Sequence, residues 1–149
     1  MFFTNRATLL ALLTLISTGL AFGHVTVQPK LSTVSKTETY ILRVPTEKSV
    51  PTVRIEVEFP AALEVSSFES KTGWKIEERK TAAGKLTGVV LIGSIPPAES
   101  VQFNFTARNP AAEGKLSFKA IQIYQDGSRV EWTGAEGSRT PAPVIEVKK

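Results

Sequence analysis

Apolar and polar residues alternate along most of the chain after residue 24. The alternation runs through residues 37–45, 53–59, 101–107 and 116–120, and β-branched and aromatic residues fill many of its apolar positions. A period of two residues is typical of strands that bury one face. No stretch shows the period of 3.6 residues that an amphipathic helix requires. The pattern therefore predicts an all-β chain.

Turn residues divide these segments and suggest how the strands connect. "QDGS" at 125–128 precedes "RVEW", and Asp-Gly supplies the positive φ angles of a tight hairpin turn. The tail "SRTPAPVIEVKK" at 138–149 predicts a turn followed by an edge strand. Short strands at this spacing favour an antiparallel β-sandwich. In the segment 53–59 we expect Val53, Ile55 and Val57 to share a face.

The first 23 residues differ from the rest of the chain. They carry one charge, Arg6, and residues 7–20 are apolar apart from Thr and Ser. A basic start and a short apolar run are typical of a secretory signal peptide, and the run is shorter than the ~20 residues of a membrane span. We therefore expect a signal peptide at 1–23 and one periplasmic or secreted domain at 24–149. No second apolar stretch predicts a transmembrane anchor in the mature chain.

Small residues before the cleavage point allow two positions for the cut. Ala21 and Gly23 fit cleavage before His24, whereas Gly19 and Ala21 fit cleavage before Phe22. We prefer the first, which makes His24 the mature N-terminus.

Composition narrows the chemistry that the mature domain can perform. The chain has 18 Lys and Arg against 14 Asp and Glu, a formal net charge of +4, and no basic run interleaved with aromatic residues. A nucleic-acid partner is therefore not expected. Cysteine is absent, and the single methionine is Met1. The mature domain thus lacks the thiol and thioether ligands of Cu(I), iron–sulfur clusters and thiolate zinc sites.

His24 is the only histidine of the chain. As a mature N-terminus it would offer its α-amino group and its ring Nδ1, which together can chelate a metal. The amine has an ordinary pKa of about 7.7–8.0, so a metal can displace its proton at modest cost. Nitrogen donors with a carboxylate suit Cu(II). The simpler interpretation is an exposed histidine that binds nothing.

Several motifs, in order, resemble a known family. They are "HVTVQP" after the leader, "RVPTEKSVPTVRIEVEFP" at 43–60, "GW" at 73–74, "NPAAEGKLSFKAIQIYQDGSRVEWTG" at 109–134 and "TPAPVIEV" near the end. Together they resemble the YcnI-like copper-binding family of bacterial envelope proteins over essentially the whole mature chain. The resemblance implies an immunoglobulin-like β-sandwich. It also implies Cu(II) held by a single-histidine brace, in which the α-amino group and ring Nδ1 of the N-terminal histidine chelate the ion. A glutamate and a nearby tryptophan complete the site.

The resemblance carries over to individual residues. His24 matches the family's N-terminal histidine, and Trp132 in "VEWTG" matches its tryptophan. Our first choice for the glutamate is Glu47, which follows the strand ending in Val-Pro. The alternative is Glu131, although alternation with Val130 and Trp132 should direct it away from the tryptophan's face.

The two tryptophans are expected to have different roles. A strand tryptophan usually belongs to the core, and we assign Trp74 to that class. Trp132 is expected to shield the metal rather than to ligate it strongly, because an indole nitrogen is only a donor. A core position remains the alternative for Trp132.

These observations favour an extracytoplasmic Cu(II)-binding protein for copper trafficking, delivery as a metallochaperone, or sequestration. Its partners would be other copper-handling proteins of the envelope. An enzyme is not expected, because the brace of copper-dependent oxygenases takes a second histidine, which this chain lacks. The alternative is a metal-free secreted β-sandwich that binds a protein or a glycan. Many family members carry a C-terminal membrane helix, and no segment of this chain resembles one.

Overall fold

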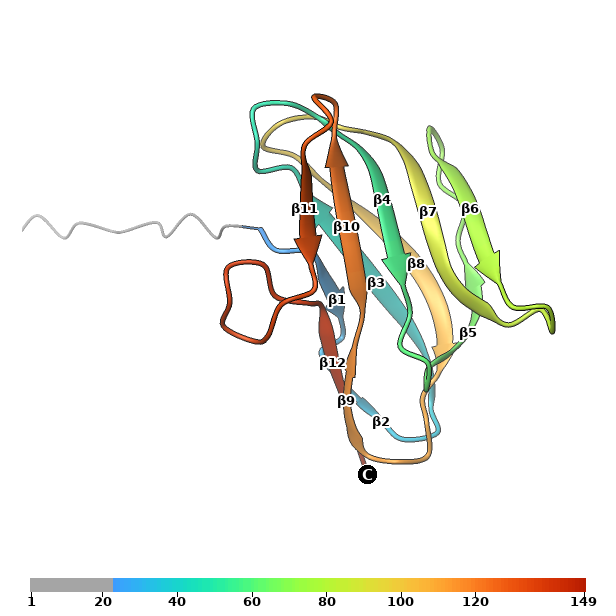
Figure 1. Ribbon diagram of the computed structural model, residues 1–149. Helices are drawn as coiled ribbons and strands as arrows, with labels where there is room; N and C mark the ends of the chain where they lie inside the picture. Colours follow the sequence, from blue (N-terminus) through green and yellow to red (C-terminus); the bar gives the residue numbers. More distant parts are fainter. Residues whose placement is uncertain (1–22) are drawn as a thin grey trace, which may run out of the picture.

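Twelve β-strands make up residues 23–149, the part of the chain that the computed structural model describes (Figure 1). Residues 1–22 of the expected signal peptide lie outside this part. Within it, no helix is long and apolar enough to cross a membrane. In chain order the strands are β1 Thr26–Gln28, β2 Leu31–Thr33, β3 Thr37–Pro45, β4 Thr52–Glu58, β5 Glu64–Phe68, β6 Lys75–Lys80, β7 Leu86–Ile95, β8 Ser100–Arg108, β9 Gly114–Ser117, β10 Lys119–Tyr124, β11 Arg129–Trp132 and β12 Val144–Lys148.

Nine strands form one large sheet that folds over into two layers. Their order is β1-β3-β8-β5-β7-β4-β10-β11, with β6 paired to β7. β5 and β7 share a single residue pair, Val65 with Leu86, and the sheet turns at this weak joint. The layer β6-β7-β4-β10-β11 lies in front of β3 and β8 in Figure 1. All pairs in this sheet are antiparallel, so the predicted antiparallel β-sandwich is confirmed.

A second sheet of three strands, β2-β12-β9, corrects the prediction for the C-terminal tail. We expected an edge strand there, but β12 is the central strand of this sheet. It pairs in parallel with β2 and antiparallel with β9. Ile145 and Val147 of β12 are buried. A strand pattern indicates which face is buried but not how many neighbours the strand has, which is why the expectation of an edge strand was wrong.

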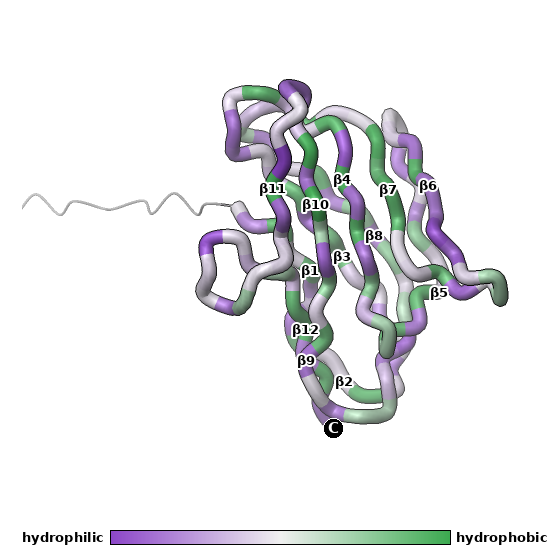
Figure 2. Tube along the Cα trace, in the orientation of Figure 1, coloured by the Kyte–Doolittle hydropathy of each residue, from purple (hydrophilic) through white to green (hydrophobic). Residues whose placement is uncertain are grey.

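Alternation along the strands builds the core between the layers. Figure 2 shows hydrophobic and hydrophilic positions alternating along the strands. Tyr40 of β3 and Phe105 of β8 are paired in register and buried. Phe68 stacks on Phe105 with the ring centroids 5.9 Å apart, and Phe59 and Phe118 pack around the same ring. One part of the core is therefore an aromatic cluster.

A β-bulge at the start of β4 places a polar residue in the core. The register with β7 shifts between Thr52 and Arg54. As a result Thr52 is fully buried, while Val53 is only half-buried. The expected shared face of Val53 and Ile55 was therefore wrong, because a bulge inserts an extra residue and breaks the two-residue period.

The predicted hairpin at 125–128 is confirmed, and it places Trp132. Gly127 adopts a φ of 83°, and its N–H donates to the carbonyl of Tyr124 at 2.9 Å. β10 and β11 then pair antiparallel, with Ala120 opposite Trp132. Trp132 is thus the last residue of β11 and faces the core.

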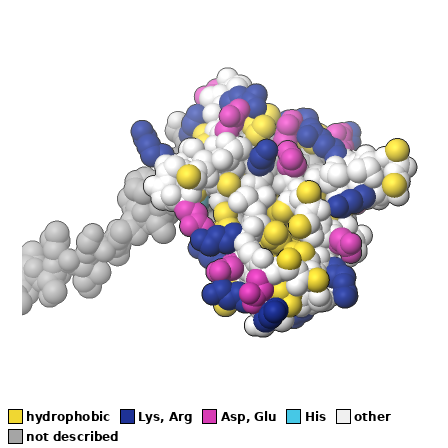
Figure 3. Space-filling model, turned by 60° about the horizontal axis from the view of Figure 1, so that its bottom comes forward, with side chains coloured by type: hydrophobic (Ala, Val, Ile, Leu, Met, Phe, Trp, Pro, Cys, Tyr) yellow, Lys and Arg dark blue, Asp and Glu magenta, His cyan; other side chains and the backbone are white. Residues whose placement is uncertain are grey.

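Charged side chains of both signs are scattered over the surface shown in the space-filling view. Figure 3 shows Lys and Arg side chains interspersed with Asp and Glu side chains, rather than gathered by sign. Ion pairs between near neighbours in the sequence include Lys36 with Glu38 and Lys148 with Glu146. Exposed pairs of this kind contribute little to stability.

Candidate metal site

His24 lies just before β1 and packs against Trp132. The imidazole and indole ring centroids are 5.5 Å apart, with the ring planes inclined by 50°. β1 continues from His24 by pairing with β3, where Thr26 is opposite Arg43. The side chains of Val25 and Val27 are buried, which fixes the path of the segment. The histidine is half-buried, so its position is determined by the fold.

Trp132 is a member of the hydrophobic core, with 3% of its surface exposed. Its indole Nε1–H donates to Oε1 of Gln122 at 3.0 Å. An indole has one N–H, so this hydrogen bond uses its donor. Trp132 therefore presents an apolar ring to His24. The same side chain belongs to the core and packs against the histidine.

Gln122, which sequence reasoning missed, is fully buried beneath this tryptophan. Its Nε2 donates to the carbonyl of Pro45 and to Oγ1 of Thr52, each at 2.7 Å. A signal for it exists in the sequence. Phe118, Ala120 and Gln122 occupy successive inward positions of one alternating segment, so a polar amide stands where the pattern calls for an apolar side chain. Such a residue is buried only with hydrogen-bond partners.

Glu47 lies two residues beyond the end of β3 and is exposed. It lines a hollow of about 500 Å³ together with Gly23, the residue before His24. Gly23 packs tightly there, since a Cβ on it would lie 2.7 Å from the side chain of Pro45. The structure thus brings Glu47 into the same hollow as the residue that precedes the histidine.

The charge of Glu47 also affects the pKa of a neighbouring buried residue, Tyr124. Burial raises the pKa of Tyr124, and the negative charge of Glu47 raises this pKa further. The ammonium of Lys48 lies 4.7 Å from the centre of the Tyr124 ring. The segment that carries Glu47 is therefore packed against the C-terminal end of β10, the strand that also carries Gln122.

Glu131 lies on the opposite face of β11 from Trp132. It is exposed, opposite Ile121 in register, and its carboxylate is 3.2 Å from the guanidinium of Arg129. The direction that alternation predicted for this side chain is confirmed. The structure does not bring Glu131 to the face that Trp132 and His24 share.

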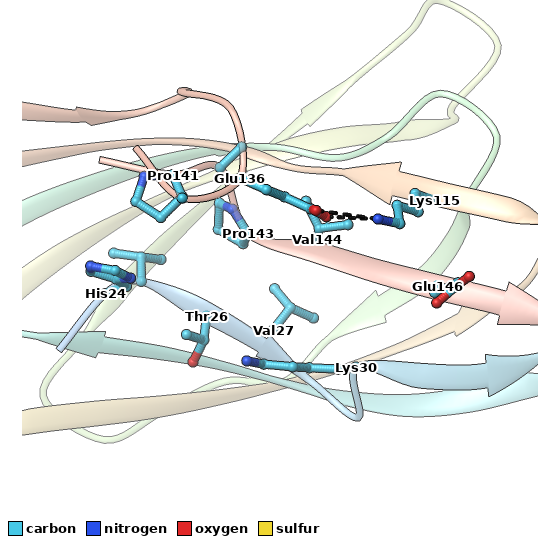
Figure 4. Close-up of a pocket in the computed structure, with 13 residues that line it drawn as sticks. His24, Thr26, Val27, Lys30, Lys115, Glu136, Pro141, Pro143, Val144 and Glu146 are labelled. Atoms are coloured by element: carbon cyan, nitrogen blue, oxygen red, sulfur yellow. Dashed lines mark hydrogen bonds and ion pairs between the residues drawn. The ribbon is translucent and has the colours of Figure 1, made fainter. Parts of the chain in front are cut away.

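A second hollow, of about 340 Å³, lies on the β1 and β12 side of His24 (Figure 4). Glu136 also lines it, but Figure 4 shows its carboxylate directed toward Lys115 rather than toward the histidine. The two groups form an exposed ion pair at 3.1 Å. Thr26 and Lys30 contribute the polar groups on the β1 side.

The donors available around His24 limit what kind of site it can make. Among residues 23–149, no three His, Cys, Asp or Glu side chains gather into a group that could hold a metal. If the chain began at His24, its α-amino group would add a second nitrogen donor beside the imidazole. One imidazole, one amine and one carboxylate form a donor set that fits Cu(II).

Trp74 has different surroundings. Its indole meets the ring of Phe103 edge-on, with centroids 5.0 Å apart. It also lies over Gly93, where a Cβ would come within 2.5 Å of the indole. Trp74 is packed against the core but half-buried, so the predicted core position is confirmed only at the core's edge.

Fold and site together define an all-β protein of the immunoglobulin-like sandwich class, with a histidine before its first strand held against a core tryptophan. The chain belongs to the YcnI family, whose sequence model is described as "Domain of unknown function (DUF1775)". The model matches residues 24–89 and 80–147, so the match begins at His24. The resemblance found in the sequence motifs is thereby confirmed.

A named relative supports this assignment. The chain is 35% identical over 135 residues to the "Copper-binding protein CutI" of Bacillus subtilis (strain 168). The alignment covers 89% of this chain and 66% of that protein, so the chain spans just under two thirds of its relative.

Solved structures confirm the fold class. A protein from Nocardia farcinica, described as having an immunoglobulin-like fold, superimposes with a TM-score of 0.70 at 27% identity, covering 85% of this chain and 99% of that one. A cohesin module from a Clostridium perfringens family 33 glycoside hydrolase gives a TM-score of 0.56 at 16% identity, covering 85% and 95%. The second likeness concerns the fold alone.

Proposed function

We propose that this chain binds one Cu(II) ion outside the cytoplasm, after removal of residues 1–23. The observation that carries the proposal is the contact of His24 with Trp132, with ring centroids 5.5 Å apart. It holds a half-buried imidazole at the point where cleavage would create a free amine. The copper-binding relative supports a copper-binding role, and the family match begins at His24.

The proposed ligands are few and have distinct roles. His24 supplies ring Nδ1 and its α-amino nitrogen, which close a chelate ring on the ion. Glu47 supplies a carboxylate, whose charge neutralises part of the charge of Cu(II). It is favoured over Glu131 because it shares a hollow with Gly23 while Glu131 faces away. Trp132 covers one side of the ion and keeps water from that position.

The oxidation state follows from the donors. Amine, imidazole and carboxylate are harder ligands than thiolate or thioether, which Cu(I) prefers. Residues 24–149 contain neither cysteine nor methionine. We therefore propose Cu(II) as the cargo. We also propose a role in trafficking or sequestration, with other envelope copper-handling proteins as partners; the copper-binding relative and the expected signal peptide support it.

The proposal is tested on protein secreted and processed by its own leader. Mass spectrometry gives the mature N-terminus, and competition titrations with Cu(II) and Cu(I) give the affinities. We expect a terminus at His24, one Cu(II) per chain and weak Cu(I) binding. A His24→Gln variant should lose the Cu(II) site, whereas Glu131→Gln is a matched control that should keep it. Tight Cu(I) binding with weak Cu(II) binding, or a terminus at Phe22, would contradict the proposal.

A further inference from the structure

A chain of buried hydrogen bonds runs from Trp132 across the sandwich to β3. Trp132 donates to Gln122, and Gln122 donates to the carbonyl of Pro45 and the hydroxyl of Thr52. The hydroxyls of Thr52 and Thr46 are 2.7 Å apart, and Thr46 donates to the carbonyl of Ile95 at 2.9 Å. Gln122 and Thr52 are fully buried, and Thr46 nearly so.

The partners of this chain fix the direction of every bond in it. An indole nitrogen can only donate and a backbone carbonyl can only accept. The Gln122 oxygen must therefore face Trp132, and its NH2 must face Pro45. The proton of Thr46 is used on Ile95, so the hydroxyl of Thr52 must donate to Thr46. Within residues 23–149 no buried side-chain nitrogen or oxygen is left without a partner. The network therefore has one arrangement.

This arrangement joins two parts of the proposed copper site that lie in different layers. Trp132, which packs on His24, belongs to β11 in one layer. Pro45 ends β3 in the other layer, two residues before Glu47. Gln122 of β10 bonds to both, so it spans the interior between them.

We infer that Gln122 is a positioning residue. It sets the indole plane of Trp132 beneath His24, and it ties that indole to the strand end that carries Glu47. The inference rests on the proposed function for its link to copper, but the placement of Trp132 can be tested without metal. The competing interpretation is that Gln122 only fills and stabilises the core. That interpretation predicts lower stability when the residue is replaced, but no specific change at His24.

The test compares two buried substitutions in the processed chain. Gln122→Met keeps the volume of the side chain and removes both bonds that define the link. Thr52→Val is the matched control, since it breaks two other bonds of the same network, those with Gln122 and Thr46, but leaves Gln122 bonded to Trp132 and Pro45. The first readout is the NMR shift of the His24 ring protons in copper-free protein, because the neighbouring indole displaces these resonances. The second readout is Cu(II) affinity by competition titration.

We expect Gln122→Met to lose most of the indole-induced shift at His24. Because the variant also loses the bond to the strand end that carries Glu47, we expect it to bind Cu(II) roughly tenfold more weakly, an effect typical of residues hydrogen-bonded around a metal site. Thr52→Val should lower the melting temperature but leave the His24 resonances near their original positions. Unchanged His24 resonances in folded Gln122→Met would overturn the inference. Equal changes in the two variants would also overturn it, because they would show a general loss of stability.

Two further results keep the test decisive. If Gln122→Met does not fold, the unmodified protein supplies the answer through its Trp132 indole N–H. Slow exchange of this proton and a nuclear Overhauser contact to the Gln122 side chain support the link, and rapid exchange overturns it. If the processed protein binds no Cu(II), the proposed function fails. The His24 shift still decides whether Gln122 positions the tryptophan.

Discussion

Trp132 and Trp74 both pack on the core of one small sandwich, but their surroundings differ. Trp132 is almost wholly buried, bonded through its N–H to Gln122, and in contact with His24. Trp74 is half-buried and lies edge-on to Phe103 over a glycine. Trp132 stands between a buried polar network and His24, whereas Trp74 extends an aromatic cluster. The sequence distinguished the two tryptophans only because one of them matches a family motif. The structure distinguishes them by their contacts.

The sharpest difference between the two tryptophans is expected in their response to copper. Cu(II) held at His24 should strongly quench Trp132, because a paramagnetic ion within several ångströms opens a non-radiative path. Trp132→Phe should abolish most of the quenching, whereas Trp74→Phe should leave it in place. Fluorescence titration of the two processed variants measures this. Strong quenching that survives in Trp132→Phe would place the ion closer to Trp74.

The same two substitutions should differ in stability. Trp132→Phe leaves the Gln122 oxygen without its donor and opens space in the core, so we expect a loss of about 2–4 kcal/mol in the free energy of unfolding. Trp74→Phe removes part of a half-exposed ring and should cost about 1 kcal/mol or less. Urea unfolding of the copper-free proteins gives both values. Equal losses would mean that the hydrogen bond to Gln122 contributes little.

The two candidate glutamates extend the comparison to the ligands. Glu47→Gln removes a charge near the N-terminal segment and should weaken Cu(II) binding by roughly tenfold, or about 1.4 kcal/mol. Glu131→Gln changes an exposed side chain on the far face of β11 and should have little effect. Competition titrations with Cu(II) compare the affinities of the two variants. A larger effect of Glu131→Gln would reject Glu47 as the ligand while leaving the family assignment intact.

The alternation of residues predicted most of the fold, because burial of one strand face depends on local sequence. The hairpin at 125–128 was likewise predictable from its own turn residues. The bulge at Thr52 and the central place of β12 were not, since both depend on which strands become neighbours. Local patterns do not contain that information.

The candidate site was only partly predictable. His24 stood out as the single histidine, and Trp132 and Glu47 came from the family motifs. Gln122 was visible only as a polar residue at an inward position. Its partners Pro45 and Thr52 lie 77 and 70 residues earlier in the chain, so only the folded structure reveals what it bonds to.

The central claim is that the amine of His24 is itself a ligand. It is tested most directly by measuring the Cu(II) affinity of the chain that begins at His24 beside the same chain acetylated at its α-amino group. Acetylation turns the amine into an amide and leaves the imidazole without its chelating partner. The account predicts a loss of affinity on the order of 100-fold or more, as expected when a two-point attachment becomes a single one. Equal affinities for the two chains would contradict it.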